Sequence, residues 1–424
     1  MRTIYFLFLF FLVLWFSPVK AQQPTRVLFL GNSYTSVNDL PNTFSSLCAS
    51  LGKPVQVASN APGGYTFNGH STNATSLALI QQGDWDVVVL QEQSQLPSFP
   101  PGQVAAQCYP FAARLDSIVN AVNPCTETMF YMTWGRQTGD ASNCANYPVV
   151  CTYEGMQGRL RESYLEMAQD NQASVSPVGM AWKKVRDDYP TINLYSADGS
   201  HPDMQGTYLT ACVFFSSLFH QSALDAPYTA GLPDSTARLL QTAAYTTVMD
   251  SISQWQGSGN WLSGSISEVQ QGSDGNVSFQ TESLHATDIS WDFGDGSIGS
   301  GTTVNHVFAT VGSYDIIVTF SNACRQVKDT VQLDLQWTTA IGEAAAAMSS
   351  GFLRSLSGQV MAYVNGKSHL RVLTVDGRVC YEEKNIIGNT VIETQHWPAA
   401  IYLWEMVPAD NASAVTRGKV FTGR

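Results

Sequence analysis

Two short stretches of the sequence together hold the residue types of a hydrolytic triad. Residues 31–35 read Gly-Asn-Ser-Tyr-Thr and follow an apolar run, which places Ser33 at the carboxyl end of a buried strand. Far downstream, Asp198 precedes His201 by three residues. The carboxylate can fix the imidazole tautomer, and the other ring nitrogen can then accept the serine proton. A serine in such a turn is most often a helix cap, but its occurrence with this Asp/His pair predicts a nucleophile.

These stretches resemble the first and last sequence blocks of the SGNH (GDSL-like) hydrolases, which read Gly-Asp-Ser-x-x and Asp-x-x-His. Asn32 stands where the family usually has aspartate, a variant of its carbohydrate-esterase-like branches. The resemblance covers roughly residues 24–225. It implies a flavodoxin-like three-layer α/β/α fold with a parallel sheet. It also implies a serine esterase that needs neither a metal nor an organic cofactor.

The resemblance further implies three donors to the oxyanion of the reaction. The backbone N–H of Ser33 is the first, and Gly64 is the second, with Gly63 as the adjacent alternative. The third donor in the family is an asparagine after the third strand, and this sequence has none there. Gln93 replaces it by register, and Gln91 is the competing choice, so the two glutamines remain open.

Other polar and aromatic residues at strand ends are weaker candidates for lining the pocket, and the substrate-binding residues stay unassigned. These weaker candidates are Tyr34, Tyr65, His70, Trp134 and Arg136.

The elements that position these residues follow from an alternation of apolar runs and amphipathic segments between residues 26 and 220. Such an alternation predicts a parallel sheet with helices on both faces. Strands are expected at 27–30, 55–59, 86–90, 128–134, 174–179 and 192–195, and helices at 40–51, 111–122, 155–171 and 206–219. A helical tail at 236–255 completes the hydrolase domain, which we expect to span 24–256.

Residues 262–335 change to short strands and frequent turns. The stretch 291–297, Trp-Asp-Phe-Gly-Asp-Gly-Ser, resembles the turn of a PKD domain, an immunoglobulin-like β-sandwich. Asp292 and Asp295 in this stretch could bind calcium, but turn chemistry alone explains them and is the favoured interpretation.

Residues 338–350 include four consecutive alanines and are expected to be a linker. The β-rich segment 351–424 resembles the C-terminal sorting domain of Bacteroidetes type IX secretion substrates, although 398–400 lacks the usual glycine. This resemblance implies the secretion machinery as a partner. The alternative is a third β-sandwich used for adhesion.

Export is also predicted at the other end of the chain. Residues 1–21 combine an early arginine, a short apolar core and a small-residue cleavage site, which is the pattern of a secretory signal peptide. We expect a secreted or cell-surface protein with no stable membrane span. The net charge of −12 over 424 residues argues against nucleic acid or an anionic membrane as partner.

Eight cysteines suit disulfides in an exported protein. Cys144 with Cys151, and Cys108 with Cys125, are plausible pairs, but connectivity cannot be read from the sequence. The chain lacks Cys-x-x-Cys and His-x-x-x-His, so we expect no zinc site.

The predicted function is a secreted serine esterase that removes acetyl or other small acyl groups from carbohydrate. A lipase or phospholipase of the same superfamily is one alternative. A non-catalytic glycan-binding surface protein is the other, because the asparagine of the third block is missing.

Overall fold

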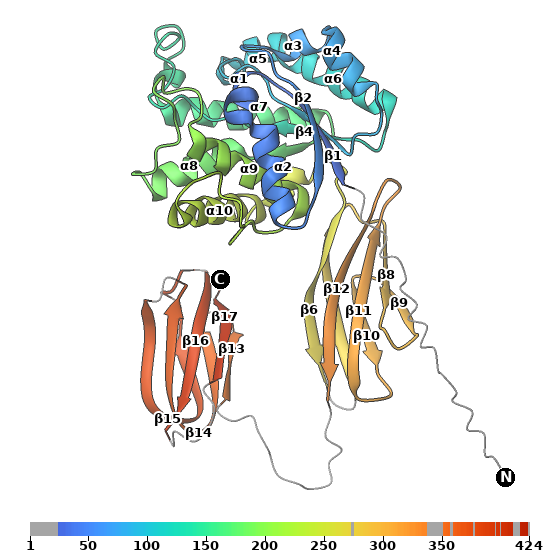
Figure 1. Cartoon of the computed structure of the whole chain (residues 1–424), viewed down its shortest axis with the longest axis vertical. Helices are drawn as coiled ribbons and strands as arrows, with labels where there is room; N and C mark the ends of the chain where they lie inside the picture. Colours follow the sequence, from blue (N-terminus) through green and yellow to red (C-terminus); the bar gives the residue numbers. More distant parts are fainter. Residues whose placement is uncertain are drawn as a thin grey trace, which may run out of the picture. The chain divides into compact units, whose positions relative to one another are not determined.

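The computed structural model describes residues 24–272, 275–336, 351–356, 359–375, 378–394, 396–398, 400–409 and 416–422. The chain divides into two compact units, 1–337 and 338–424 (Figure 1). The predicted signal peptide at 1–21 and the predicted linker at 338–350 lie outside the described residues.

A five-stranded parallel sheet organises the first part of unit 1. Its strands are β1 (Thr25–Leu30), β2 (Val55–Asn60), β3 (Val87–Leu90), β4 (Glu127–Tyr131) and β5 (Ser174–Ser176). The order β2-β1-β3-β4-β5 is the flavodoxin-like order, which confirms the predicted fold class. In this order the chain reverses direction across the sheet between β1 and β3, so the carboxyl ends of these strands border the usual ligand crevice.

Helices cover both faces of the sheet (Figure 1). The α-helices are α1 (Ser33–Ser36), α2 (Leu40–Ser50), α3 (Phe67–His70), α4 (Ala74–Ile80), α5 (Pro101–Gln107), α6 (Tyr109–Val122), α7 (Tyr153–Asp170), α8 (Val178–Asp188), α9 (Met204–Phe219), α10 (Asp234–Met249) and α11 (Ile252–Gln256). Short 3₁₀ helices are η1 (Val37–Asp39), η2 (Leu96–Ser98) and η3 (Pro148–Cys151). Alternate residues of β1 serve the two cores: Val27 and Phe29 pack with α2 and α9, whereas Leu28 and Leu30 pack with α6 and α7.

Two predicted strands are wrong in part or entirely. The run 174–179 is a strand only to Ser176, because Pro177 cannot donate to the ladder and α8 begins at Val178. Gly179 lets α8 approach closely, since an added Cβ would lie 2.1 Å from the Thr133 carbonyl oxygen. Residues 192–195 form no strand, and Tyr195 makes only an isolated bridge with Pro202. The predicted helix 236–255 is instead the pair α10 and α11.

The rest of unit 1 is an antiparallel β-sandwich. Its strands are β6 (Ser263–Gln271), β7 (Asn276–Leu284), β8 (Asp288–Asp292), β9 (Ile298–Ser300), β10 (Thr303–Val307), β11 (Gly312–Ser321) and β12 (Gln326–Leu335). They form the sheets β10-β7-β6 and β12-β11-β8-β9. Phe279, Trp291 and Val318 lie in the core between the two sheets.

Two disulfides occur among the described residues. The disulfide Cys144–Cys151 confirms the predicted pair, which closes a short loop. Cys125 pairs with Cys324, between β11 and β12, and thereby joins the sandwich to the α/β domain. The pair Cys108–Cys125 is wrong, because these residues flank opposite ends of α6, whose 14 residues span about 21 Å. Cys108 is instead a buried free thiol with its Sγ 3.6 Å from Sδ of Met167.

Unit 2 is a second antiparallel β-domain. Its strands are β13 (Gly351–Leu356), β14 (Gln359–Thr374), β15 (Val379–Glu393), β16 (Ala400–Pro408) and β17 (Thr416–Thr422). The long strand β14 pairs with β13, β15 and β16. Leu370, Val372 and Trp404 belong to its core. Its role as a sorting domain stays a prediction.

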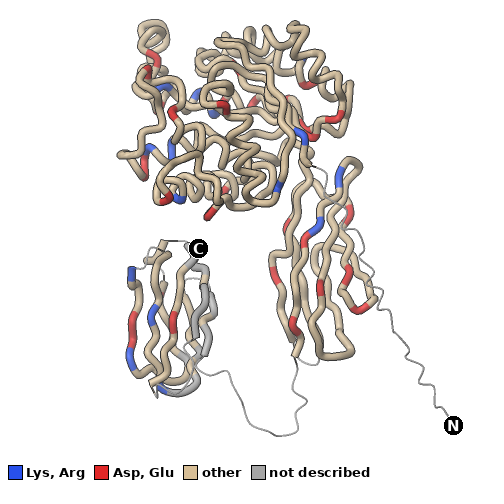
Figure 2. The backbone as a smooth tube through the Cα atoms, in the orientation of Figure 1, with Lys and Arg blue, Asp and Glu red and all other residues tan. Residues whose placement is uncertain are grey.

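The charge distribution fits the low basic content of the sequence. Lys and Arg are scattered along the α/β domain (Figure 2). Within the described residues, no helix has both the length and the apolar character that crossing a bilayer requires.

Candidate active site

A tight turn at the carboxyl end of β1 presents Ser33. Asn32 caps α1, and its side-chain Oδ1 accepts from the Tyr34 backbone N–H at 3.1 Å. Gly31 is required there, because an added Cβ would lie 2.4 Å from Thr35 Oγ1 and 2.6 Å from Gln91 Oε1. The strand-to-helix turn therefore leaves the serine partly exposed and keeps its two neighbours on the amino-terminal side buried.

The structure brings Ser33, His201 and Asp198 together across 168 residues of sequence. Ser33 Oγ lies 2.8 Å from Nε2 of His201, and Nδ1 of the same ring lies 2.5 Å from Asp198 Oδ2. The other carboxylate oxygen accepts from the backbone N–H groups of Ser200 and His201, each at 2.9 Å. Burial raises the pKa of Asp198, but these hydrogen bonds outweigh it and leave the pKa below its ordinary value. An ionised Asp198 holds the ring proton on Nδ1 and frees Nε2 to accept one.

The predicted backbone donors are unused in hydrogen bonds within the described residues. The N–H groups of Ser33, Gly64 and the neighbouring Gly63 have no acceptor there. Gly64 has φ of +67°, a left-handed conformation that favours glycine, whereas its neighbour Gly63 does not. The turn after β2 thus requires glycine at the first choice of second donor.

The two candidate glutamines have different environments. Gln91 is buried, and its Oε1 accepts from the Asn32 N–H at 2.9 Å and from Thr35 Oγ1 at 3.0 Å. Its Nε2 donates to the Glu92 carbonyl oxygen. Gln93 is partly exposed; its Oε1 caps η2 at the N–H groups of Gln95 and Leu96, and its Nε2 makes one bond of 3.2 Å to Gln95. Each Nε2 therefore donates one hydrogen bond and each Oε1 accepts two, so the two glutamines differ in exposure rather than in free amide protons.

The sequence indicated no role for Glu92. Its side chain connects the segment after Gly64 with the segment that contains Gln93. The carboxylate is fully buried and accepts from the N–H groups of Phe67, at 3.0 Å, and Gln93, at 2.6 Å. Burial raises its pKa to about 7. The one signal in the sequence is a charged residue directly after an apolar strand. Because charged residues are mostly exposed, this signal does not predict that Glu92 is buried.

Three of the weaker pocket candidates are core residues instead. Tyr34 and Trp134 are 2% and 0% exposed and stack on each other, with ring centroids 4.6 Å apart. His70 is also fully buried, with Nε2 2.8 Å from the Gly31 carbonyl oxygen and Nδ1 2.8 Å from Ser76 Oγ. Only Tyr65 and Arg136 remain partly exposed.

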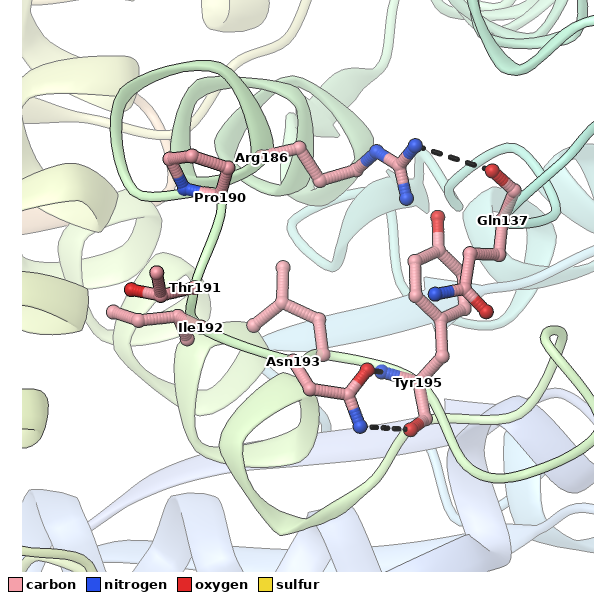
Figure 3. A pocket seen from close by; sticks show the side chains of 8 residues that line it. Gln137, Arg186, Pro190, Thr191, Ile192, Asn193 and Tyr195 are labelled. Carbon is pink, nitrogen blue, oxygen red and sulfur yellow. Dashed lines mark hydrogen bonds between the residues drawn. The ribbon is translucent and has the colours of Figure 1, made fainter.

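A pocket of about 440 Å³ borders the back of the histidine loop (Figure 3). Arg186, Gln137 and Tyr195 are among its lining residues, and the Arg186 guanidinium donates to the Gln137 carbonyl oxygen at 3.1 Å. The Gln137 N–H in turn donates to the Gly199 carbonyl oxygen at 2.8 Å. None of the triad residues lines this pocket, so the pocket lies outside the triad.

The described part of the chain contains no cluster of three or more His, Cys, Asp or Glu side chains fit to hold a metal. In the sandwich, Asp292 Oδ1 accepts from the Gly294 N–H, and Asp295 contacts Ser297 and His306. Both carboxylates therefore accept hydrogen bonds within the turn.

We compared the chain with known proteins. No curated protein matches the chain. Among solved structures, a DUF4886 family protein from Bacteroides uniformis is 20% identical, with 54% of this chain and 95% of that chain covered and a TM-score of 0.46. A candidate SGNH hydrolase from Slackia heliotrinireducens is 26% identical over 45% of this chain and 97% of that chain, with a TM-score of 0.38.

The esterase EstA from a Pseudoalteromonas species is 14% identical over 45% of this chain and 95% of that chain, with a TM-score of 0.31. A family model described as the PKD domain matches residues 261–335, which confirms the PKD domain predicted at 262–335.

Proposed function

We propose that this protein is a serine ester hydrolase of the SGNH type that removes small acyl groups, acetyl foremost, from carbohydrate. The observation that supports it is the hydrogen-bonded chain from Ser33 Oγ through the His201 ring to Asp198, with distances of 2.8 and 2.5 Å. This arrangement has the base within reach of the nucleophile and a carboxylate on the far ring nitrogen.

In the proposed reaction, Ser33 Oγ attacks the ester carbonyl carbon while its proton passes to His201 Nε2. The imidazolium is stabilised by Asp198 and gives this proton to the departing alcohol as the carbon–oxygen bond breaks. Water then attacks the carbonyl carbon of the acyl-serine and loses a proton to the same nitrogen. The imidazolium gives that proton to Ser33 Oγ as the bond between this oxygen and the acyl carbon breaks, which releases the acid and free Ser33. Each half-reaction returns the histidine to its neutral state.

The oxyanion would be held by the backbone N–H groups of Ser33 and Gly64 and by the Gln93 side chain. Gln93 is preferred over Gln91 because its side chain is partly exposed, whereas Gln91 is buried and its Oε1 is bonded to Asn32 and Thr35 beneath the turn. Removing one oxyanion donor typically lowers kcat by about 10²–10³-fold. Gln93→Ala should show that loss, and Gln91→Ala should lower stability first.

The exposure of the site to solvent supports a substrate in which the ester is carried on a large molecule. His201 and Asp198 side chains are 34% and 49% exposed, so a polymer-borne acyl group can reach the nucleophile from solvent. The choice of acetylated carbohydrate rests on the resemblance to carbohydrate-esterase-like branches. We also propose export through residues 1–21 and use of 351–424 for sorting, which N-terminal sequencing and mass measurement of the protein from culture medium would test.

The decisive experiment is hydrolysis of p-nitrophenyl acetate by the purified protein. Wild type should turn over, and Ser33→Ala and His201→Ala should fall to background. Ser36→Ala, an exposed serine three residues on, and His369→Ala, in the separate C-terminal unit, should keep wild-type rates. Equal background rates in all five proteins would instead favour the glycan-binding alternative.

The substrate class needs a second comparison. Acetyl release from acetylated xylan should exceed hydrolysis of long-chain p-nitrophenyl esters. The reverse preference would favour the lipase alternative.

A further inference from the structure

The catalytic histidine lies on an exposed loop whose own contacts do not fix it to the nucleophile. Ser196 N–H bonds to the His201 carbonyl oxygen at 2.8 Å, and Ser196 Oγ bonds to the Pro202 carbonyl oxygen at 2.9 Å, so the loop closes on itself. Asp198 belongs to the same loop, so its hydrogen bond to the His201 ring does not tie that loop to Ser33. A separate contact must therefore keep His201 Nε2 at 2.8 Å from Ser33.

Tyr34, the residue after the nucleophile, makes one such contact. Its hydroxyl lies 2.7 Å from Oγ of Ser200, the residue before His201. The tyrosine ring is held in a stack: its centroid is 4.6 Å from that of Trp134, which lies 3.8 Å from that of Trp182. Trp134 Nε1 also donates to the Ser200 carbonyl oxygen at 3.0 Å. Both hydrogen bonds converge on Ser200 from a rigid, buried aromatic column.

Asn38 makes the second contact, on the other side of the histidine. Its Nδ2 donates to the carbonyl oxygen of Pro202 at 3.1 Å and to Thr207 Oγ1 at 3.0 Å. The backbone of Asn38 is left-handed, with φ of 56° and ψ of 18°. Asparagine tolerates this conformation better than most residues, and here it directs the side chain to the loop.

We propose that Tyr34 and Asn38 are positioning residues that hold His201 against Ser33 by fixing Ser200 and Pro202, the residues on either side of it. Both come from the segment 33–39 that begins with the nucleophile, so nucleophile and base are tied to one piece of backbone. This inference rests on the proposed esterase. Burial raises the pKa of the Tyr34 hydroxyl, which therefore stays protonated.

The test compares Tyr34→Phe and Asn38→Gly with wild type. Phenylalanine keeps the aromatic stack and removes the hydroxyl, and glycine keeps the left-handed backbone and removes the amide. Each variant should lower kcat about fivefold to tenfold, the effect of one or two lost hydrogen bonds, with KM within about twofold of wild type. Ser200→Ala should lower kcat as much as Tyr34→Phe does. The double variant Tyr34→Phe/Ser200→Ala should have the same kcat as either single variant, because the tyrosine acts through Ser200.

A matched control separates positioning from general destabilisation. Tyr208→Phe removes another buried tyrosine hydroxyl, which donates to the Tyr228 carbonyl oxygen at 2.9 Å and accepts from Gln241 Nε2 at 2.8 Å, both outside the loop 196–203. It should leave kcat unchanged.

Amide hydrogen exchange of the peptide 196–203 gives a readout that does not depend on activity. Exchange should quicken in Tyr34→Phe and Asn38→Gly and stay at the wild-type rate in Tyr208→Phe. Unchanged exchange in both positioning variants overturns the inference, whatever happens to kcat. If wild type hydrolyses no ester but exchange quickens as described, the esterase proposal fails while the holding role of Tyr34 and Asn38 stands.

Discussion

Removing the disulfide Cys125–Cys324 should destabilise unit 1 far more than removing Cys144–Cys151. The first closes a sequence separation of 199 residues and the second a separation of 7. The chain-entropy relation for loop closure gives about 5 kcal/mol for the long loop and about 2 kcal/mol for the short one at 25 °C. All four cysteines are partly buried, so the cavities left by alanine are similar and the difference, about 3 kcal/mol, reflects loop length.

The contacts around Cys324 support the comparison, because they should survive the substitution. The Arg325 guanidinium lies 3.5 Å from the ring centroid of Trp261, and Asn322 Nδ2 donates to the Asn260 carbonyl oxygen at 3.3 Å. The native arrangement of the sandwich on the α/β domain is therefore held by more than the cross-link. The substitution should act mainly on the unfolded chain.

The assay is urea unfolding of the double variants Cys125→Ala/Cys324→Ala and Cys144→Ala/Cys151→Ala, followed by tryptophan fluorescence and circular dichroism. The first should lose about 3 kcal/mol more free energy of unfolding than the second. Its hydrolysis of p-nitrophenyl acetate at 25 °C should stay at the wild-type rate, since neither cysteine belongs to the triad. Equal losses in the two double variants would refute the loop-closure reasoning.

Three further predictions concern single buried or catalytic groups. Asp198→Asn should lower kcat by about 10³–10⁴-fold at nearly constant KM, because the amide favours the wrong imidazole tautomer; a loss below tenfold in steady-state kinetics contradicts this. Burial raises the pKa of Glu92 from 4.5 to about 7, so its contribution to stability is present below pH 4.5 and is lost as pH rises through 7. Glu92→Gln should remove this decline, about 3 kcal/mol, from urea unfolding measured between pH 4.5 and 7.5, and an unchanged slope argues against it. Trp134→Ala should cost about 3–5 kcal/mol in the same assay at fixed pH, since it empties a fully buried site; a loss under 1 kcal/mol would contradict the stacked column.

Much of the fold is predictable because its signals are local. Apolar runs bounded by turn residues located β1 to β4, and amphipathic spacing located α2, α6, α7 and α9, within a few residues. The predicted strand 174–179 was wrong in part, because a short apolar run is compatible with either a strand or a helix. Val175 and Val178 both lie in such a run, yet Pro177 divides it between a strand and a helix.

Distant pairings were beyond the sequence for a different reason. Cys125 pairs with Cys324 rather than with Cys108, because the length of α6 separates the near pair and the sandwich brings the far one in. No residue next to Cys125 in the chain indicates this partner.

For the site, the sequence determined the residue types, their order along the chain, and the turn that exposes Ser33 after β1. These follow from chemistry and from backbone rules that act over a few residues. Only the tertiary structure decided which side chains are free to act. It buried Gln91, His70 and Trp134 and left Gln93 partly exposed. Burial and hydrogen-bond partners depend on segments far apart in the sequence, so no local pattern could assign them.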